Sequence, residues 1–251
     1  MNKHNGCSAS SRRLFLTARW MRLAMLNWEI DPEILAAYIP SGTQLDFFQG
    51  RTFVSMVGFQ FLQVRLLGIP IPFHNNFEEV NLRFYVRREL NGESRRGVVF
   101  IKELAPHWAI AKVARFFYNE NYQTLAMRHR VEGFESPSEN PSVEYQWRFG
   151  DRWQGVGLQA DGPCRPLTAG SQEEFIAEHY WGYSALRDGG TAEYRVEHPP
   201  WNVWPANNAR LDCDIEKIYG SQFVAPMSQT PASSFIADGS AVTVSRPVRI
   251  C

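Results

Sequence analysis

The main indication of the architecture is the stretch Phe77-Glu78-Glu79-Val80-Asn81-Leu82-Arg83-Phe84-Tyr85-Val86. Apolar side chains alternate with polar ones along it, which is the two-residue period of a β-strand. On the outside of a sheet the polar side would face water, whereas in a sheet that closes into a barrel it can face the lumen. The sequence leaves both arrangements open, and the choice between them decides whether the protein has an enclosed reactive pocket.

Length and composition predict a soluble globular protein with a large core. The chain has 251 residues, of which 44% are hydrophobic and 14% aromatic, enough for one large domain. The 26 basic residues balance the 26 acidic ones, so no net field attracts nucleic acid or an anionic membrane. No apolar run approaches the roughly 18–20 residues that span a bilayer. We therefore expect neither nucleic acid nor membrane among the partners.

The N-terminus predicts a flexible tail. Residues 1–13 are polar and rich in small side chains, and the apolar part that follows, 14–26, is interrupted by Arg19 and Arg22 without a cleavage site. We expect a disordered tail over residues 1–13, a single domain over residues 14–251 and a cytoplasmic location. The four cysteines are scattered, which is typical of neither a disulfide scaffold nor a zinc site.

Helix start signals are few, and strand-like segments fill most of the chain. Capping residues and prolines predict helices over 32–38, 107–118 and 171–181. Short strands are predicted over Thr52–Phe59, Val80–Val86, Gly97–Leu104, Val143–Phe149, Gly155–Ala160, Ala192–Glu197, Arg210–Ile218, Ser233–Ala237 and Ala241–Val244, with turns at Asn91-Gly92, Asp188-Gly189-Gly190 and Asp238-Gly239-Ser240. Parallel strands need crossover connections, which are usually helices, and the predicted helices are too few to supply them. The sheets should therefore be mainly antiparallel.

Several motifs resemble those of a known family. They are Asn81-Leu82-Arg83-Phe84-Tyr85-Val86, Ala114-Arg115-Phe116-Phe117-Tyr118, Glu178-His179-Tyr180-Trp181-Gly182-Tyr183, Glu193-Tyr194-Arg195-Val196-Glu197-His198-Pro199 and Ser233-Ser234-Phe235-Ile236-Ala237-Asp238-Gly239-Ser240. Together they resemble the YqjF-like family of bacterial proteins, domain of unknown function 2071, which is related to acetoacetate decarboxylase. The resemblance implies a mainly β (α+β) fold, an antiparallel closed β-barrel of the acetoacetate decarboxylase-like type, with a few peripheral helices and an enclosed pocket.

The resemblance also suggests catalytic residues. The decarboxylase uses an uncharged lysine that forms a Schiff base with a keto acid, together with an acidic group and a carboxylate-binding arginine. Phe77-Glu78-Glu79 is similar to the aromatic-x-Glu signature of that enzyme, so Glu79 takes the place of its catalytic glutamate. Arg19 and Arg22 bracket the position of its carboxylate-binding arginine.

The lysine positions differ from those of the decarboxylase. Glu103-Leu104 is similar to the Glu-Leu that precedes its paired lysines, yet those positions fall on Ala109 and Ile110 here. Lys112 comes two residues later, which predicts a protein other than a true acetoacetate decarboxylase. On the predicted helix Arg115 is close to Lys112 and could lower its pKa, or Lys112 could simply lie at the solvated edge of that helix.

Other candidate residues follow from the strand and the third helix. Glu79, Asn81 and Arg83 would form a polar strip able to hold a carboxylate if they face a lumen, or a solvated surface if they do not. His179 and Tyr180 could serve binding or acid–base chemistry, or they could pack the end of the helix against the sheet. No metal, nucleotide or redox motif is present, so we expect no metal and no cofactor.

Two functions remain open at this point. The first is an enzyme that acts on a small keto or carboxylic acid, with Glu79 for proton transfer, Arg22 or Arg83 for the carboxylate and Lys112 as an optional nucleophile. The alternative is a non-catalytic protein that binds or senses a small molecule in the same pocket. A homo-oligomer is a further expectation, with exposed aromatic residues of 201–204 at the subunit interface.

Overall fold

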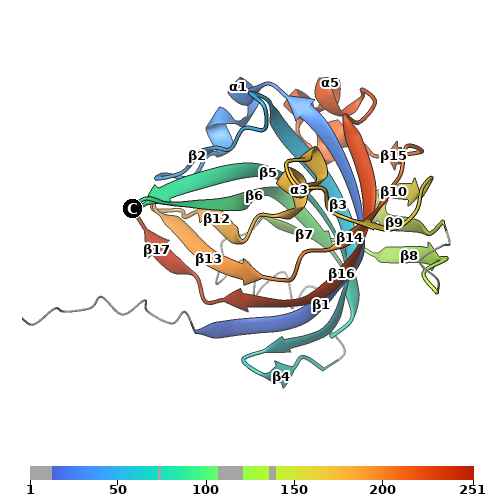
Figure 1. The fold of residues 1–251 in the computed structure, drawn as a ribbon, viewed down its shortest axis with the longest axis horizontal. Coiled ribbons are helices and arrows are strands. Elements are labelled where there is room, and N and C mark those ends of the chain that lie inside the picture. Colours follow the sequence, from blue (N-terminus) through green and yellow to red (C-terminus); the bar gives the residue numbers. More distant parts are fainter. Residues whose placement is uncertain (1–12, 73–74, 107–120, 136–139) are drawn as a thin grey trace, which may run out of the picture.

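The computed structural model describes residues 13–72, 75–106, 121–135 and 140–251, and most of these lie in two β-sheets (Figure 1). The larger sheet has 13 strands among the described residues, and its central path is β16-β1-β3-β5-β6-β12-β13. These strands are β1 (Leu14–Ile30), β3 (Thr52–Leu66), β5 (Phe77–Leu90), β6 (Glu93–Ala105), β12 (Trp181–Ala185), β13 (Thr191–Glu197) and β16 (Ser233–Ser245). Because β13 also pairs with β16, the pairings connect these strands in a ring.

Shorter elements complete the fold. The large sheet also includes β2 (Gln44–Leu45), β4 (Ile69–Pro70), β7 (Tyr122–Thr124), β11 (Arg165–Pro166), β14 (Asn202–Pro205) and β17 (Val248–Ile250). The second sheet consists of β8 (Met127–Glu132), β9 (Ser142–Phe149), β10 (Arg152–Gln159) and β15 (Arg210–Asp212). The described helices are α1 (Pro32–Leu35), η1 (Ala36–Tyr38), α3 (Gln172–Ala177), α4 (Ile215–Tyr219), η2 (Ser221–Phe223) and α5 (Val224–Met227). In the described part of the chain, no helix has the length and apolar character needed to cross a membrane.

The predicted mostly β fold is confirmed, but the large sheet is mixed. Most of its pairings are antiparallel, whereas β6 pairs in parallel with both β12 and β7. Tight hairpins can join only antiparallel strands, and the chain runs a long way between β6 and each of these partners. The sheet is thus mainly antiparallel, as expected, and these two parallel pairings make it mixed.

The first strand was missed by the sequence reading, and one predicted turn lies inside a strand. β1 spans 17 residues, and a bulge at Arg22, where φ is 58°, interrupts its alternation. The predicted turn at 238–240 is part of the continuous strand β16, because Gly239 adopts a φ of 88° directly against the Trp20 carbonyl. Any side chain at Gly239 would collide with that backbone, so glycine permits the strand to continue there.

Two predicted elements end earlier than expected. Helix α3 begins as predicted, with the Ser171 hydroxyl accepting a hydrogen bond from the Glu174 N–H at 3.1 Å, but it ends at Ala177. Trp181 begins β12 instead, because it pairs with β13 and β6. The predicted strand 210–218 stops at Asp212, since Asp214 caps α4 by accepting from the Lys217 N–H.

Other predicted elements agree with the structure or lie outside it. The helix start at Asp31 is confirmed, since its side chain accepts from the Glu33 N–H at 2.9 Å. The predicted helix 107–118 lies outside the described residues, and so does the predicted tail apart from Arg13.

Both faces of the ring of strands are packed. On the outer face, Leu82 and Phe84 of β5 join a core with Tyr145 and Trp147 of the second sheet. A second cluster, which includes Phe59, lies on the inner face. Because β5 is packed on both faces, its polar side chains are buried as well as its apolar ones.

The aromatic residues predicted for a subunit interface belong to these cores. Trp201 is 3% exposed and Trp204 is 5% exposed. The prediction of an exposed aromatic surface at 201–204 was therefore wrong, because these side chains pack inside the chain.

Candidate functional site

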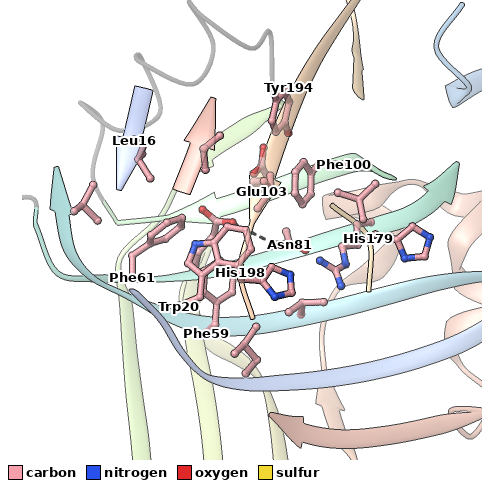
Figure 2. Close-up of a pocket in the computed structure, with 18 of the residues that line it drawn as sticks. Leu16, Trp20, Phe59, Phe61, Asn81, Phe100, Glu103, His179, Tyr194 and His198 are labelled. Carbon is pink, nitrogen blue, oxygen red and sulfur yellow. Dashed lines mark hydrogen bonds between the residues drawn. The ribbon is translucent and has the colours of Figure 1, made fainter. Parts of the chain in front are cut away.

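A cavity lies against the inner face of the ring, with walls from β1, β3, β5, β6, β12, β13 and β16. About 130 Å³ of it is open to the centres of water molecules, many times the roughly 10–15 Å³ that one water needs on this measure. Figure 2 shows Leu16 and His179 towards opposite ends of the cavity, with Trp20, Phe59 and Asn81 between them. A small organic molecule therefore fits inside.

Strand β5 supplies the polar side of this cavity. Glu79, Asn81 and Arg83 line it, and their exposed fractions are only 2%, 3% and 8%. The residues between them, including Leu82, face the outer core. The polar side of the alternating stretch thus faces the interior and not solvent.

A β-bulge in β6 decides which charged residue joins them. Leu82 pairs with Lys102 and Arg83 pairs with Phe100, so Ile101 is an extra residue on β6. The bulge reverses the alternation, and Glu103 faces the cavity opposite Asn81. Lys102 points the other way, and its amine donates to the Ile218 carbonyl. Bulges commonly re-aim side chains next to active sites.

Glu79 lies in a buried cluster of hydrogen-bonding groups. The Tyr122 hydroxyl donates to Glu79 Oε2 at 2.7 Å, and Asn81 Nδ2 donates to Glu79 Oε1 at 3.2 Å. Burial raises the pKa of Glu79 to about 7, against the opposing effect of these two hydrogen bonds. Burial, followed by the charges of Glu103 and Glu79, raises the pKa of Tyr122 well above its usual value. At neutral pH Glu79 can therefore hold or release a proton.

Arg83 and His179 form a second polar group on the cavity wall. The Arg83 guanidinium donates through Nη2 to the Ile176 carbonyl at 3.2 Å. His179 Nε2 lies 3.2 Å from Asp46 Oδ2, which Arg96 Nε also approaches at 2.6 Å. Burial raises the pKa of Asp46, but hydrogen bonds from His179 and Arg96 lower it on balance. Burial lowers the pKa of His179 to about 4, so its ring is neutral at physiological pH.

Several buried polar atoms of the cavity wall have no hydrogen-bond partner among the described residues. On β5 and after α3 they are Arg83 Nε, Asn81 Oδ1 and His179 Nδ1, and Trp20 Nε1 is a further one on β1. Because the Asp46 carboxylate accepts from His179 Nε2, Nδ1 is left as an acceptor. Apart from Trp20, one donor and two acceptors are thus available to a polar ligand, and buried polar groups of this kind normally have partners.

Most of the remaining cavity wall is apolar and largely aromatic, and the ring of His198 stacks on Trp201 there with centroids 4.2 Å apart. Trp20 packs edge-on against Phe59 and Phe61, with ring centroids 5.5 and 5.9 Å apart. Phe61 stacks on Phe77 with centroids 4.9 Å apart. Beyond these rings the wall continues to Leu16 at the start of β1. The site therefore combines a polar end with an apolar end.

Two predicted site residues lie away from the cavity. The bulge in β1 turns Arg22 outward, where Nη1 donates to Gln60 Oε1 at 3.0 Å and the guanidinium lies over the Phe134 ring. Tyr180 donates to Glu178 and packs against the ring of His198 at 5.0 Å. Neither side chain lines the cavity. Lys112 and Arg115 lie outside the described residues.

Three residues of the site were not predicted. Tyr122 reaches Glu79 from the three-residue strand β7, too short to leave a pattern in the sequence. Asp46 meets His179 across 133 positions of the chain. Glu103 had a signal, since it belongs to the Glu-Leu pair that is similar to the decarboxylase. Among the described residues, no group of three or more His, Cys, Asp or Glu is placed to hold a metal ion.

Comparison of the sequence with known proteins identifies a family and a relative. The profile of the DUF2071 family, described as "Uncharacterized conserved protein", matches residues 17–241. The uncharacterized protein YqjF of Bacillus subtilis (strain 168) is 27% identical over 203 residues, covering 79% of this chain and 78% of that protein.

Solved structures with the same fold are enzymes. Acetoacetate decarboxylase from Legionella pneumophila has a TM-score of 0.63 and 14% identity, over 100% of this chain and 98% of that one. The enduracididine biosynthesis enzyme MppR, bound to the condensation product of pyruvate and imidazole 4-carboxaldehyde, has a TM-score of 0.63 and 12% identity, over 97% and 92%. Identities this low establish similarity of fold alone.

Proposed function

The chain belongs to the DUF2071 family, and on the basis of its cavity we propose that it is an acid–base enzyme acting on a small keto or carboxylic acid. The observation that carries this proposal is the carboxyl of Glu79, which is buried in the cavity wall and has a pKa of about 7. A general acid or base is most effective when its pKa lies near the working pH. Side chains whose pKa is strongly shifted by burial cluster at functional sites.

In the proposed complex Arg83 binds the carboxylate of the ligand. Its Nε has no partner among the described residues, and a guanidinium binds a carboxylate through charge-assisted hydrogen bonds. Glu79 and Arg83 are four residues apart on β5, or about 13 Å between Cα atoms at the usual rise of a strand. The Arg83 guanidinium donates to the Ile176 carbonyl and lies over the Tyr85 ring. We therefore propose that the bound acid spans the distance from there to Glu79 and that the carbon next to its carbonyl lies near the Glu79 carboxyl.

The proposed step is the transfer of a proton between that carbon and Glu79. The Glu79 carboxylate takes the proton from the carbon, an enolate forms, and the same carboxyl returns the proton to carbon or oxygen. Asn81 Nδ2 and the Tyr122 hydroxyl hold the Glu79 carboxyl in place. We further propose that the ring of strands acts as a closed barrel, which would exclude bulk water from the enolate.

Solvent deuterium exchange tests this step directly. A panel of 2-oxo acids in D₂O, followed by proton NMR, should show enzyme-dependent loss of the signal at the carbon beside the carbonyl. Glu79→Gln should abolish the exchange while the acids still bind, because the amide keeps the shape of the carboxyl but cannot take the proton. Exchange by Glu79→Gln at the wild-type rate would refute the role of Glu79.

A Schiff-base mechanism is a separate question, because the MppR structures contain pyruvate or a product formed from it. No lysine is among the described residues that line the cavity. Lys112, which lies outside the described residues, is the remaining candidate named by the sequence. Borohydride reduction in the presence of 2-oxo acids, followed by peptide mass analysis, should leave Lys112 unmodified if Glu79 acts without a covalent intermediate. A reduced adduct on Lys112 would establish the covalent route.

A binding or sensing protein is the second candidate. The observation in its favour is the same lack of lysine on the described wall, combined with a mostly apolar lining. Native mass spectrometry of the protein purified from its own host distinguishes the two. A sensor should retain one ligand per chain and show no deuterium exchange, whereas an enzyme should exchange and release its product.

A further inference from the structure

The cavity has two chemically different ends, and this constrains the shape of its ligand. The charged or titratable groups on its described wall, among them Glu79, Arg83 and His179, lie on β5, β6, β7 and β13 or on the residues just after α3 and β13. The lining residues of β1 and β3, by contrast, are all uncharged: Phe15, Leu16, Trp20, Leu23, Val57, Phe59, Phe61, Val64 and Leu66. A charged group would be stable only at the first end, because burying a charge in an apolar environment is costly.

The apolar wall extends well beyond the polar groups. Glu79 lies opposite Phe59 on β3, and the lining continues on that strand to Leu66. The seven steps from Phe59 to Leu66 correspond to about 23 Å of strand. Ile71, just after β4, also lines this end and is half-buried. A ligand of three or four carbons bound at Arg83 would leave most of this wall uncovered.

The apolar end reaches the protein surface at the hairpin of β3 and β4. The Leu67 N–H donates to the Phe15 carbonyl at 2.8 Å, which joins this hairpin to β1. Leu67 and Ile69 at the tip are 52% and 69% exposed. Among the described residues, those that line the cavity next to this hairpin, Leu16, Leu66 and Ile71, are all uncharged.

We propose that the ligand is a carboxylic or keto acid with an apolar tail of about six to ten carbons, a length that advances about 1.2 Å per bond when extended. Its carboxylate lies at Arg83, and its tail runs along Trp20, Phe59 and Phe61 towards Leu66 and Ile71. The inference rests on the proposed function, since it takes the carboxylate to bind at Arg83. It specifies the substrate class as amphipathic acids instead of short ones such as pyruvate.

Binding of straight-chain 2-oxo acids tests the tail. Isothermal titration with the four-, eight- and twelve-carbon acids should show the dissociation constant falling about fourfold for each added methylene, the factor equivalent to burying one CH₂ group. Equal affinity for the four- and twelve-carbon acids would overturn the inference but leave the proposed function intact. Failure of every acid to bind would overturn the proposed function itself.

A matched pair of variants locates the tail. Ile71→Asp places a charge on the apolar wall and should remove the gain in affinity with chain length, while the four-carbon acid binds as in the wild type. Ile69→Asp makes the same change two residues away on the exposed tip, outside the lining, and should preserve the gain. An Ile71→Asp variant that still favours the twelve-carbon acid as strongly as Ile69→Asp does would refute the proposed path of the tail.

Discussion

The buried carboxyl of Glu79 should make the stability of the fold depend on pH in a specific way. Burial raises its pKa from 4.5 to about 7, so the folded state holds this proton more tightly than the unfolded state does. The stabilisation is fully present below pH 4.5 and is lost as the pH rises through about 7. At 1.36 kcal/mol per unit, the loss between about pH 5 and about pH 8.5 comes to about 2.5 kcal/mol.

The Glu79→Gln variant removes this titration, because the glutamine amide has a similar shape but binds no proton in this pH range. Its free energy of unfolding, from urea denaturation, should fall by about 2.5 kcal/mol less than that of the wild type over the same pH interval. Other groups titrate in both proteins, so their contributions cancel in the difference. Glu197→Gln is the control, because the side chain of Glu197 is 57% exposed, and its curve should run parallel to that of the wild type.

Parallel curves for the wild type and Glu79→Gln would refute the reasoning. They would mean that the folded protein binds the Glu79 proton no more tightly than the unfolded chain. The carboxyl would then be ionised at neutral pH with the pKa of an ordinary glutamate, and it would be a weaker base than the proposed proton transfer from carbon requires.

Four further predictions concern other residues. Arg83→Gln should weaken binding of 2-oxohexanoate by about tenfold to a hundredfold, since a hydrogen bond to a charged group is lost. Titration of the matching 2-oxo amide should show little change, and an equal loss of affinity for the acid and the amide would contradict carboxylate binding. Burial lowers the pKa of His179 to about 4, so the stability that neutral His179 contributes is complete above the unfolded pKa of 6.5 and is lost as the pH falls towards 4. NMR of the His179 ring carbons should show no titration midpoint near 6.5. Gly239→Ala should lower the free energy of unfolding by about 2 kcal/mol or more, because the new methyl group collides with backbone. Thermal unfolding should show a smaller loss for Gly189→Ala, where φ is also positive at 84° but the space around the residue is open. Lys102→Gln should leave acid binding unchanged because its amine points away from the cavity, so a large loss of affinity would place that amine inside.

The sequence predicted the polar side of the site but not its direction. Glu79, Asn81 and Arg83 alternate with apolar residues, and that period is enough to place them on one side of a strand. The same period fits a solvated face and a buried one, because alternation does not record what packs on either side. The direction became clear only from the second sheet, whose Tyr145 and Trp147 cover the opposite face of β5.

Irregularities of the strands account for most of what the sequence could not predict. The bulge in β1 turned Arg22 away from the cavity, and the bulge in β6 brought Glu103 into it. Neither Arg22 nor Ile101 is a glycine, so no residue type marks these positions. Tyr122 and Asp46 reach the site through long-range contacts of very short strands or loops, which leave no local pattern. Capped helices such as α1, in contrast, carry their start signals in adjacent residues and were predicted correctly.

The bulge at Ile101 gives the family a simple route for evolutionary change. Lys102 and Glu103 are neighbours on β6, and the bulge alone selects the acidic one for the interior. If the bulge moved to the far side of Lys102, strand alternation would bring an amine inward and send the carboxylate outward, with no codon altered at either position. A descendant could thereby exchange acid chemistry for amine chemistry at one point of the same scaffold, through a shift in hydrogen-bond register.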